Sequence, residues 1–149
     1  MRVVFDTNIY ISAFVFRGSS AENAIRRVLN NQDIFIISKP IIEETLRILA
    51  DKFERNIEEL SRTAVFLSEI AVTVVPNKQI TVLSDDPDNR ILECAVEGDA
   101  DKIVTGDKAM LRVSMYEEIE IISLRSYLSS DLNTQSLIHS EKGRLTELR

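Results

Sequence analysis

Short apolar runs alternate with longer amphipathic stretches over most of the chain. Five runs predict buried strands, at residues 3–5, 34–37, 72–75, 102–104 and 119–122. Apolar residues at helical spacing between these runs predict helices, at about residues 21–29, 39–49, 56–70, 85–97, 108–113 and 123–128. Residues 9–16 are apolar apart from Ser12 and end at a Gly-Ser-Ser break.

Polar residues and glycine mark several of the predicted helix ends. Ser20 and Ser38 each precede a helical stretch and are expected to cap it. Pro40 follows at an early helical position, where the N–H group that proline lacks would have no partner in any case. Gly98 lies just beyond the helix predicted for residues 85–97, where glycine commonly ends a helix.

The alternation of strands with helices predicts the fold class. It favours a central parallel sheet with helices on both faces, that is, a three-layer α/β/α sandwich. The length of 149 residues fits one domain, which we expect over residues 1–128, with a polar tail at residues 129–149. His139 lies in this tail, and we expect it to be exposed and without a role in a site. In a sheet of this kind, ligands bind beyond the carboxyl ends of the strands.

Composition and charge narrow the class of protein. Hydrophobic residues make up 44% and charged residues 28% of the chain, as in ordinary soluble proteins. Cys94 is the only cysteine, which excludes an internal disulfide, and we expect it to fill the core. No signal peptide or membrane-spanning run is visible, so we expect a soluble cytoplasmic protein without contact to a membrane. The net charge of −6 counts against a large non-specific nucleic-acid footprint.

Four acidic residues that are far apart in the sequence are expected near one edge of the sheet. Asp6 directly follows the first predicted strand and Asp107 closely follows the fourth, so both should lie at strand carboxyl ends. Asp88 begins a helix after a loop, and Glu44 lies in the first turns of the helix that follows the second strand. The four carboxylates can therefore converge in the folded chain.

Converging carboxylates repel one another, and a divalent cation is the simplest compensation. Mg²⁺ and Mn²⁺ prefer oxygen ligands. A cation held in this way can activate a water and offset the charge of a phosphodiester, so the acidic net charge is compatible with a nuclease. Neighbouring polar residues could orient the carboxylates or the metal's waters, namely Asn8, Ser12, Asn89 and Thr105.

These acids also have purely structural interpretations. An Asp after a strand or loop commonly forms a turn or caps a helix, which applies to Asp88. Glu44 alone fits an exposed helix position, and Glu43 is its rival as the acid that faces the site. Asp85 and Asp86 offer the same choice beside Asp88.

Four short motifs occur in the order typical of one family. They are residues 3–8 (VVFDTN), 36–44 (IISKPIIEE), 86–95 (DPDNRILECA) and 100–107 (ADKIVTGD). With these motifs, residues 1–128 resemble the PIN-domain family. The resemblance is closest to the prokaryotic toxin branch of the family, which is related to the VapC ribonucleases.

The resemblance implies a function and a set of site residues. The reaction that it implies is the endonucleolytic hydrolysis of RNA with Mg²⁺ or Mn²⁺ as cofactor. The acids that it implies as catalytic and metal-binding residues are Asp6, Glu44, Asp88 and Asp107. Asn8 and Thr105 look like the polar residues that accompany the first and last acids. The resemblance also implies a small antitoxin protein as partner, and a homodimer.

Two other functions are compatible with parts of the pattern. An aspartyl-phosphate phosphotransferase could use Asp6 as its nucleophile, but such enzymes require a second Asp two residues later, where this chain has Asn8. A non-catalytic PIN-like scaffold could bind RNA or act in regulation. The sequence has no Cys/His cluster with zinc spacing and no glycine-rich phosphate loop.

Overall fold

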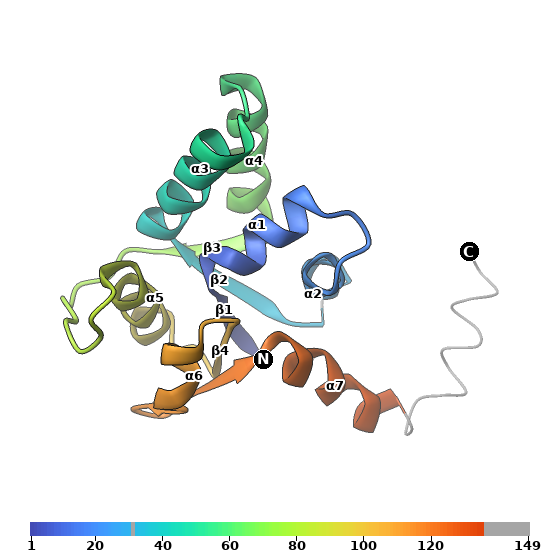
Figure 1. Ribbon diagram of the computed structural model, residues 1–149. Coiled ribbons are helices and arrows are strands. Elements are labelled where there is room, and N and C mark those ends of the chain that lie inside the picture. The colour runs from blue at the N-terminus through green and yellow to red at the C-terminus, as the bar shows by residue number, and fades with distance from the viewer. Residues whose placement is uncertain (31, 136–149) are drawn as a thin grey trace.

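The computed structural model describes residues 1–30 and 32–135, in which helices flank a six-stranded sheet (Figure 1). The strands lie in the order β3-β2-β1-β4-β6-β5. Their bounds are β1 (Arg2–Phe5), β2 (Ile34–Ser38), β3 (Ala71–Val74), β4 (Lys102–Thr105), β5 (Met115–Tyr116) and β6 (Ile119–Ser123). All neighbouring pairs are parallel except β5 with β6. The predicted α/β/α fold class with a central parallel sheet is thus confirmed.

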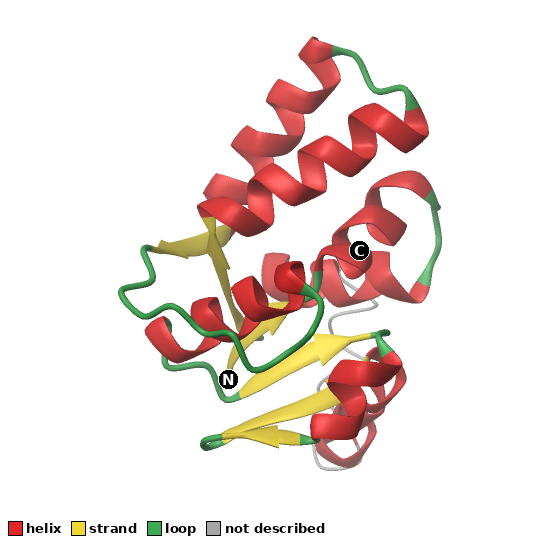
Figure 2. Cartoon of the chain, turned by 60° about the vertical axis from the view of Figure 1, so that its left-hand side comes forward, coloured by secondary structure: helices red, strands yellow, loops and turns green. Residues whose placement is uncertain are grey.

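Seven helices lie within the described residues. Their bounds are α1 (Thr7–Val15), α2 (Ser20–Leu29), α3 (Lys39–Phe53), α4 (Ile57–Ile70), α5 (Asp86–Glu97), α6 (Lys108–Val113) and α7 (Leu124–Gln135). α5 covers one face of the sheet, and α1, α2 and α7 cover the other (Figure 1). α3 and α4 form a hairpin that projects from the end of the sheet bordered by β3 (Figure 2).

The starts of two helices differ from the sequence predictions. The cap of α2 is Ser19 and not Ser20, because the Ser19 side chain accepts the Glu22 N–H at 3.2 Å. The prediction chose the wrong one of two adjacent serines, since apolar spacing does not fix the first helical residue to within one position. Ser38 does hold the N-cap position of α3, but its side chain makes no capping hydrogen bond.

The predicted C-terminal tail is described only in its first part. The final helix was predicted to end at residue 128, whereas α7 continues through the first part of the tail to Gln135. The remainder of the tail, residues 136–149 with His139, lies outside the described residues. Within the described part of the chain, no helix is long and apolar enough to cross a membrane.

β5 is an element that the sequence did not predict. It has two residues and pairs antiparallel with β6, Met115 opposite Glu120 and Tyr116 opposite Ile119. The chain turns between the two strands at Glu117, whose φ is +54°. A run of two residues carries no periodic signal, so nothing in the hydrophobic pattern could reveal this strand.

The core holds β1 and β4 rigidly side by side. Val4 on β1 and its neighbour Ile103 on β4 are fully buried, since helices cover both faces of the sheet at this point. Cys94 on α5 is fully buried in the same core, which confirms its predicted position. The polar residues that follow β1 and β4 are therefore fixed at one edge of the sheet, and they form the candidate site.

Candidate metal centre

The first and last predicted acids follow neighbouring parallel strands. β1 and β4 pair in register, with Phe5 opposite Val104. The Asp6 N–H extends this pairing and donates to the Val104 carbonyl at 2.9 Å. Asp6 and the segment that leads from β4 to Asp107 therefore lie together at the carboxyl edge of the sheet. This is the edge where α/β sheets commonly bind ligands.

Thr105, the last residue of β4, connects these two acids through its hydroxyl. The hydroxyl donates to Asp6 Oδ2 at 2.6 Å and accepts the Asp107 N–H at 3.0 Å. Because Thr105 is fully buried, the hydroxyl has no competing bond to solvent and its orientation is fixed by these two partners. It orients the Asp6 carboxylate and the loop that carries Asp107, which is the geometry of a residue that supports metal-holding acids.

Asp107 combines a structural role with a position in the site. Its Oδ1 accepts the N–H groups of Ala109 and Met110 at 2.7 and 3.2 Å, and so caps α6. Its carboxylate also offers an oxygen within 4.8 Å of oxygens from Asp85 and Asp88. Asp107 is thus both the N-cap residue of α6 and a member of the group of acids.

Asp85 and Asp88 belong to the start of α5, which approaches the same edge. Asp85 is the N-cap residue and Asp88 lies in the first turn. Together with Asp107 they form a cluster in which the three carboxylate oxygens lie within 4.8 Å of one another. The Asp88 residue is only 6% exposed, and within residues 1–30 and 32–135 its carboxylate accepts no hydrogen bond. A buried carboxylate without a partner is costly, so its environment calls for a ligand.

The pKa values show that these acids share one electrostatic environment. Burial raises the pKa of Asp88 to about 7, and the next cause is the nearby charge of Asp107. The charges of Asp6 and Asp85 add to the same rise. Burial also raises the pKa of Asp6, while the hydrogen bond from Thr105 lowers it and the charge of Asp107 raises it. Asp6 therefore belongs electrostatically to the cluster, as predicted for a shared site.

Among residues 1–30 and 32–135, no cationic side chain forms an ion pair with this cluster. The ion pairs formed among the described residues do not involve Asp6, Asp85, Asp88 or Asp107. Carboxylate oxygens are hard ligands of the kind that Mg²⁺ and Mn²⁺ prefer. The residues present thus fit a divalent cation, which would offset their mutual repulsion.

Glu44 lies apart from the cluster of Asp85, Asp88 and Asp107. Its two carboxylate oxygens accept from Arg47, at 2.7 Å from Nη2 and 3.2 Å from Nε. It lines a cavity of about 180 Å³, together with Thr7, Pro40, Ile41, Asp86, Pro87 and Arg90. The cavity thus borders the cluster through Thr7, next to Asp6, and through Pro87, next to Asp88. The structure therefore places Glu44 beside the site, with its carboxylate held by Arg47.

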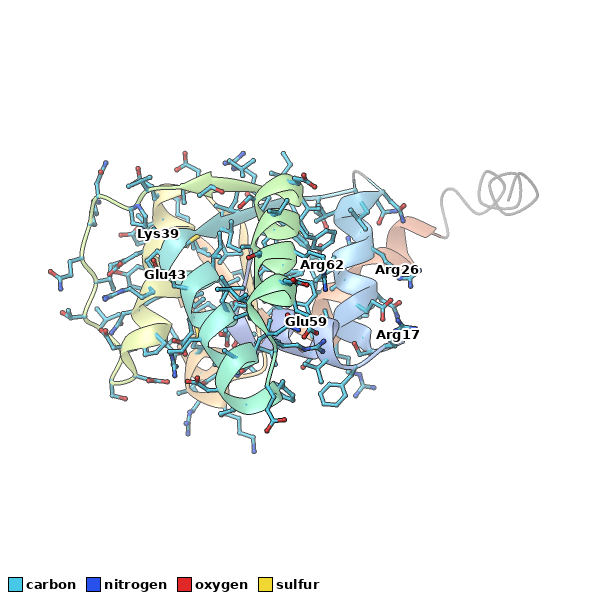
Figure 3. The ribbon with its side chains drawn as sticks, turned by 90° about the horizontal axis from the view of Figure 1, so that it is seen from above. Arg17, Arg26, Lys39, Glu43, Glu59 and Arg62 are labelled. Atoms are coloured by element: carbon cyan, nitrogen blue, oxygen red, sulfur yellow. The ribbon has the colours of Figure 1, made fainter. Side chains whose placement is uncertain are left out.

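Glu43, the rival of Glu44, lies on the exposed surface of α3. It forms a loose ion pair with Lys39, at 3.7 Å between Oε1 and Nζ (Figure 3). The side chains of both residues are largely exposed. Of the two glutamates, Glu44 is the one that lines the cavity next to the cluster.

The other polar residues named from the sequence have different surroundings. Asn8 is exposed and Ser12 is half-buried, and in the described residues neither side chain hydrogen-bonds to an acid of the cluster. The Asn89 side chain binds the backbone of Leu83 and not a carboxylate. Of the four residues expected to orient the acids, Thr105 is the one whose side chain hydrogen-bonds to an acid, while Asn8 acts through its backbone, whose hydrogen bond lowers the pKa of Asp6.

Asp85 was expected only as an alternative to Asp88, and the structure brings it into the cluster. Its position offered one signal, because it precedes Asp88 by three residues and side chains at this spacing lie on the same side of a helix. That signal was masked by the common role of Asp as a helix cap.

The fold agrees with the family to which the chain belongs. Residues 2–109 match the sequence profile of the PIN domain, and the chain is a member of the PIN domain family. The resemblance inferred from the four short motifs is confirmed.

One curated relative and two solved structures show the range of similar proteins. The uncharacterised protein MJ1680 of Methanocaldococcus jannaschii is 25% identical over 130 residues, which cover 85% of this chain and 82% of that protein. VapBC2 from Rickettsia felis, solved bound to a DNA fragment from its promoter, has a TM-score of 0.61 at 14% identity and covers 83% of this chain and 98% of its own. VapBC-1 from nontypeable Haemophilus influenzae has a TM-score of 0.61 at 20% identity, with 84% and 99% covered. At these identities the two structures establish the shared fold.

Proposed function

We propose that this protein is a Mg²⁺- or Mn²⁺-dependent endoribonuclease of the PIN domain family. The observation that carries the proposal is the convergence of Asp6, Asp88 and Asp107 from three separate elements into one electrostatic environment, in which the described residues provide no ion-pair partner. Membership of the PIN domain family supports it, as do the positions of Asp6 and Asp107 after β1 and β4 and of Asp88 in the first turn of α5.

The acids have distinct roles in this proposal. Asp88 and Asp107 hold the divalent cation, and Asp6 joins them in the orientation that Thr105 gives it. When bound, such a cation stabilises negative charge on a phosphodiester and makes a water more acidic. Glu44 is a candidate fourth ligand and would have to release Arg47 to take part. The cavity beside it would accept part of the RNA adjoining the scissile bond.

The partner and the setting of the protein follow from the same family relationship. The two solved structures with this fold are VapBC assemblies. We therefore propose that the protein is the toxin of a toxin–antitoxin pair, that a small antitoxin protein binds it, and that it acts in the cytoplasm as a homodimer. Co-purification with the product of an adjacent small open reading frame would test the partner, and a single-species monomer of full activity would contradict the homodimer.

RNA cleavage by the purified protein tests the nuclease function. We expect cleavage of RNA with Mn²⁺ or Mg²⁺, no cleavage in EDTA, and a loss of about a hundredfold or more in Asp88→Asn. Asp99→Asn is the matched control, because Asp99 follows the other end of α5, is exposed, and has a left-handed φ of +49° that Asn also adopts readily. Equal cleavage by wild type and Asp88→Asn would assign the activity to a contaminant.

One observation favours a second function, that of a non-catalytic RNA-binding or regulatory scaffold. Glu44 is occupied by Arg47, so the four acids of the family do not all meet. Calorimetric titration with Mn²⁺ separates the two functions. A nuclease site should bind the ion with a heat that disappears in Asp88→Asn, whereas a scaffold that binds RNA should show no such heat.

A further inference from the structure

The loop between β3 and α5 is held against α5 by side chains of that helix. The Asn89 side chain forms two hydrogen bonds with the backbone of one loop residue. Its Oδ1 accepts the Leu83 N–H at 2.9 Å, and its Nδ2 donates to the Leu83 carbonyl at 2.9 Å. Asn89 is only 2% exposed, so these two bonds are shielded from competition by water.

A second group of contacts holds the loop three residues earlier. Oε2 of Glu93 accepts the Ile80 N–H at 2.9 Å, and Nη2 of Arg90 donates to the Ile80 carbonyl at 3.2 Å. The two side chains form an ion pair with each other at 2.8 Å. Ile80 itself is 7% exposed and part of the core. The loop is thus fixed at two points by consecutive turns of α5.

The residue that this arrangement brings to the metal centre is Asp85. It follows Leu83 by two residues and occupies the N-cap position of α5, yet its carboxylate makes no capping hydrogen bond. Its backbone carbonyl accepts the Asp88 N–H at 3.1 Å, whereas no hydrogen bond or ion pair within the described residues involves its carboxylate. The usual reason for an Asp at a helix start therefore does not apply here.

The carboxylate of Asp85 instead faces other carboxylates. Its oxygen lies within 4.8 Å of oxygens from Asp88 and Asp107. Asp88 is itself more than nine-tenths buried and accepts no hydrogen bond from the described residues. Repulsion between the Asp85 carboxylate and its two neighbours destabilises the metal-free fold, because no capping hydrogen bond or ion pair among the described residues offsets it. A cation bound by all three carboxylates would relieve this repulsion.

We propose that Asp85 supplies a further carboxylate to the divalent-metal site, and that Asn89 is the positioning residue that holds the Asp85 loop in place. This inference rests on the proposed metal-dependent function. Asp85 lies within the cluster, whereas the Glu44 carboxylate is held by Arg47. Asn89 acts through the Leu83 backbone and does not touch the acids.

Titration of the full-length protein with Mn²⁺ tests the role of Asp85. We expect Asp85→Asn to weaken Mn²⁺ binding by about tenfold or more, with Asp99→Asn unchanged. The apparent melting temperature of the metal-free Asp85→Asn protein should not fall, because the substitution removes like-charge repulsion and no hydrogen bond. Mn²⁺ affinity equal to wild type in Asp85→Asn, with binding lost in Asp88→Asn, would overturn this inference and leave the proposed function standing. Absence of Mn²⁺ binding in the wild type would overturn both.

A double-mutant cycle tests whether Asn89 acts through Asp85. Asn89→Ala should weaken Mn²⁺ binding by about tenfold, and in the Asp85→Asn background it should cause little further loss. A general destabilisation of the fold would instead lower affinity by the same factor in both backgrounds, which would contradict the positioning role.

The second attachment point gives an independent check if Asn89→Ala does not fold. Glu93→Gln keeps an oxygen that can accept the Ile80 N–H, so we expect it to retain most of the Mn²⁺ affinity. Glu93→Ala removes that acceptor and should weaken the binding of Mn²⁺. Equal affinity in Glu93→Gln and Glu93→Ala would contradict the idea that the loop attachment sets the site.

Discussion

Single residues in the site combine structural and chemical roles. Thr105 is a strand residue whose hydroxyl links two acids, and Asp107 caps α6 while facing the cluster. Asp88 has no structural bond of this kind, and its carboxylate is buried next to like charges. Ionised Asp88 therefore destabilises the metal-free fold, and the effect should be visible in the pH dependence of stability.

Asp88 should make the stability of the metal-free protein depend on pH. Its pKa is about 7 in the folded chain and 3.8 in its ordinary state, so the folded protein binds the proton more tightly. The contribution of Asp88 to stability should be largest below about pH 4 and fall as the pH rises from about 4 to about 7, by up to about 1.4 kcal/mol per pH unit. Urea unfolding in EDTA across this pH range measures the free energy of unfolding.

The Asp88→Asn variant isolates this effect from the other titrating groups. Its stability should fall less steeply with pH than that of the wild type, because the neutral amide does not titrate. Asp99→Asn should follow the wild-type curve, since that residue lies at the other end of α5. Parallel curves for wild type and Asp88→Asn would show that the Asp88 carboxyl does not carry the pH dependence.

At the scale of elements, the site depends on how closely α5 packs against the sheet. Gly98 ends α5 directly over β2, where a Cβ atom would lie 2.3 Å from Cγ2 of Ile36. Ile36 is fully buried, so its side chain has little room to move. The residue type at position 98 therefore fixes the distance between the helix that carries Asp88 and the strands that position Asp6.

Gly98→Ala should destabilise the protein through this contact. We expect a loss of about 1–3 kcal/mol in the free energy of unfolding, which is the usual range for an overpacked core. Gly106→Ala is the control, because no atom lies within 4 Å of a Cβ built there. The midpoint of urea unfolding measures both variants. A Gly98→Ala midpoint no lower than that of Gly106→Ala would mean that α5 can shift without cost.

The helices α1, α2 and α4 show why predictions of elements from sequence succeed or fail. The amphipathic α2 and α4 were predicted within one residue of their observed bounds. α1 was left unassigned, since Ile9, Tyr10 and Ile11 are consecutive buried residues and the helix packs against α2, α3 and the sheet. A helix that is buried on several sides has no polar face, and periodicity then carries no signal.

At the scale of the whole molecule, the strand order brings the acids together. β1 is paired with β2 on one side and with β4 on the other, so the chain crosses over between β3 and β4. The crossover connection brings Asp107 next to Asp6, although the two residues are 101 positions apart in the sequence. A crevice at such a reversal of strand order is where doubly wound sheets bind their ligands.

A divalent cation that binds only the folded protein should stabilise the whole molecule. At a free Mn²⁺ concentration of about 100 times Kd, the gain should be about 2.7 kcal/mol. The thermal unfolding midpoint of the wild type should therefore rise with Mn²⁺ and return to its starting value in EDTA. Asp88→Asn should show little of this rise and Asp99→Asn all of it. A similar rise in all three proteins would indicate ion binding outside the cluster.

The sequence by itself determined the alternation of strands and helices, the α/β/α class and the position of Asp6, Asp88 and Asp107 at the ends of elements. It could do so because these features depend on local periodicity and on residues next to each element. It placed Glu44 in the same site and gave little weight to Asp85, since both choices depend on side-chain contacts between elements. Only the tertiary structure decided that Arg47 holds Glu44, that the Asn89 side chain binds the Leu83 backbone and that Asp85 lies beside Asp88 and Asp107. The physical reason is that strand order and loop attachment arise from long-range packing, which the hydrophobic pattern of a single segment does not encode.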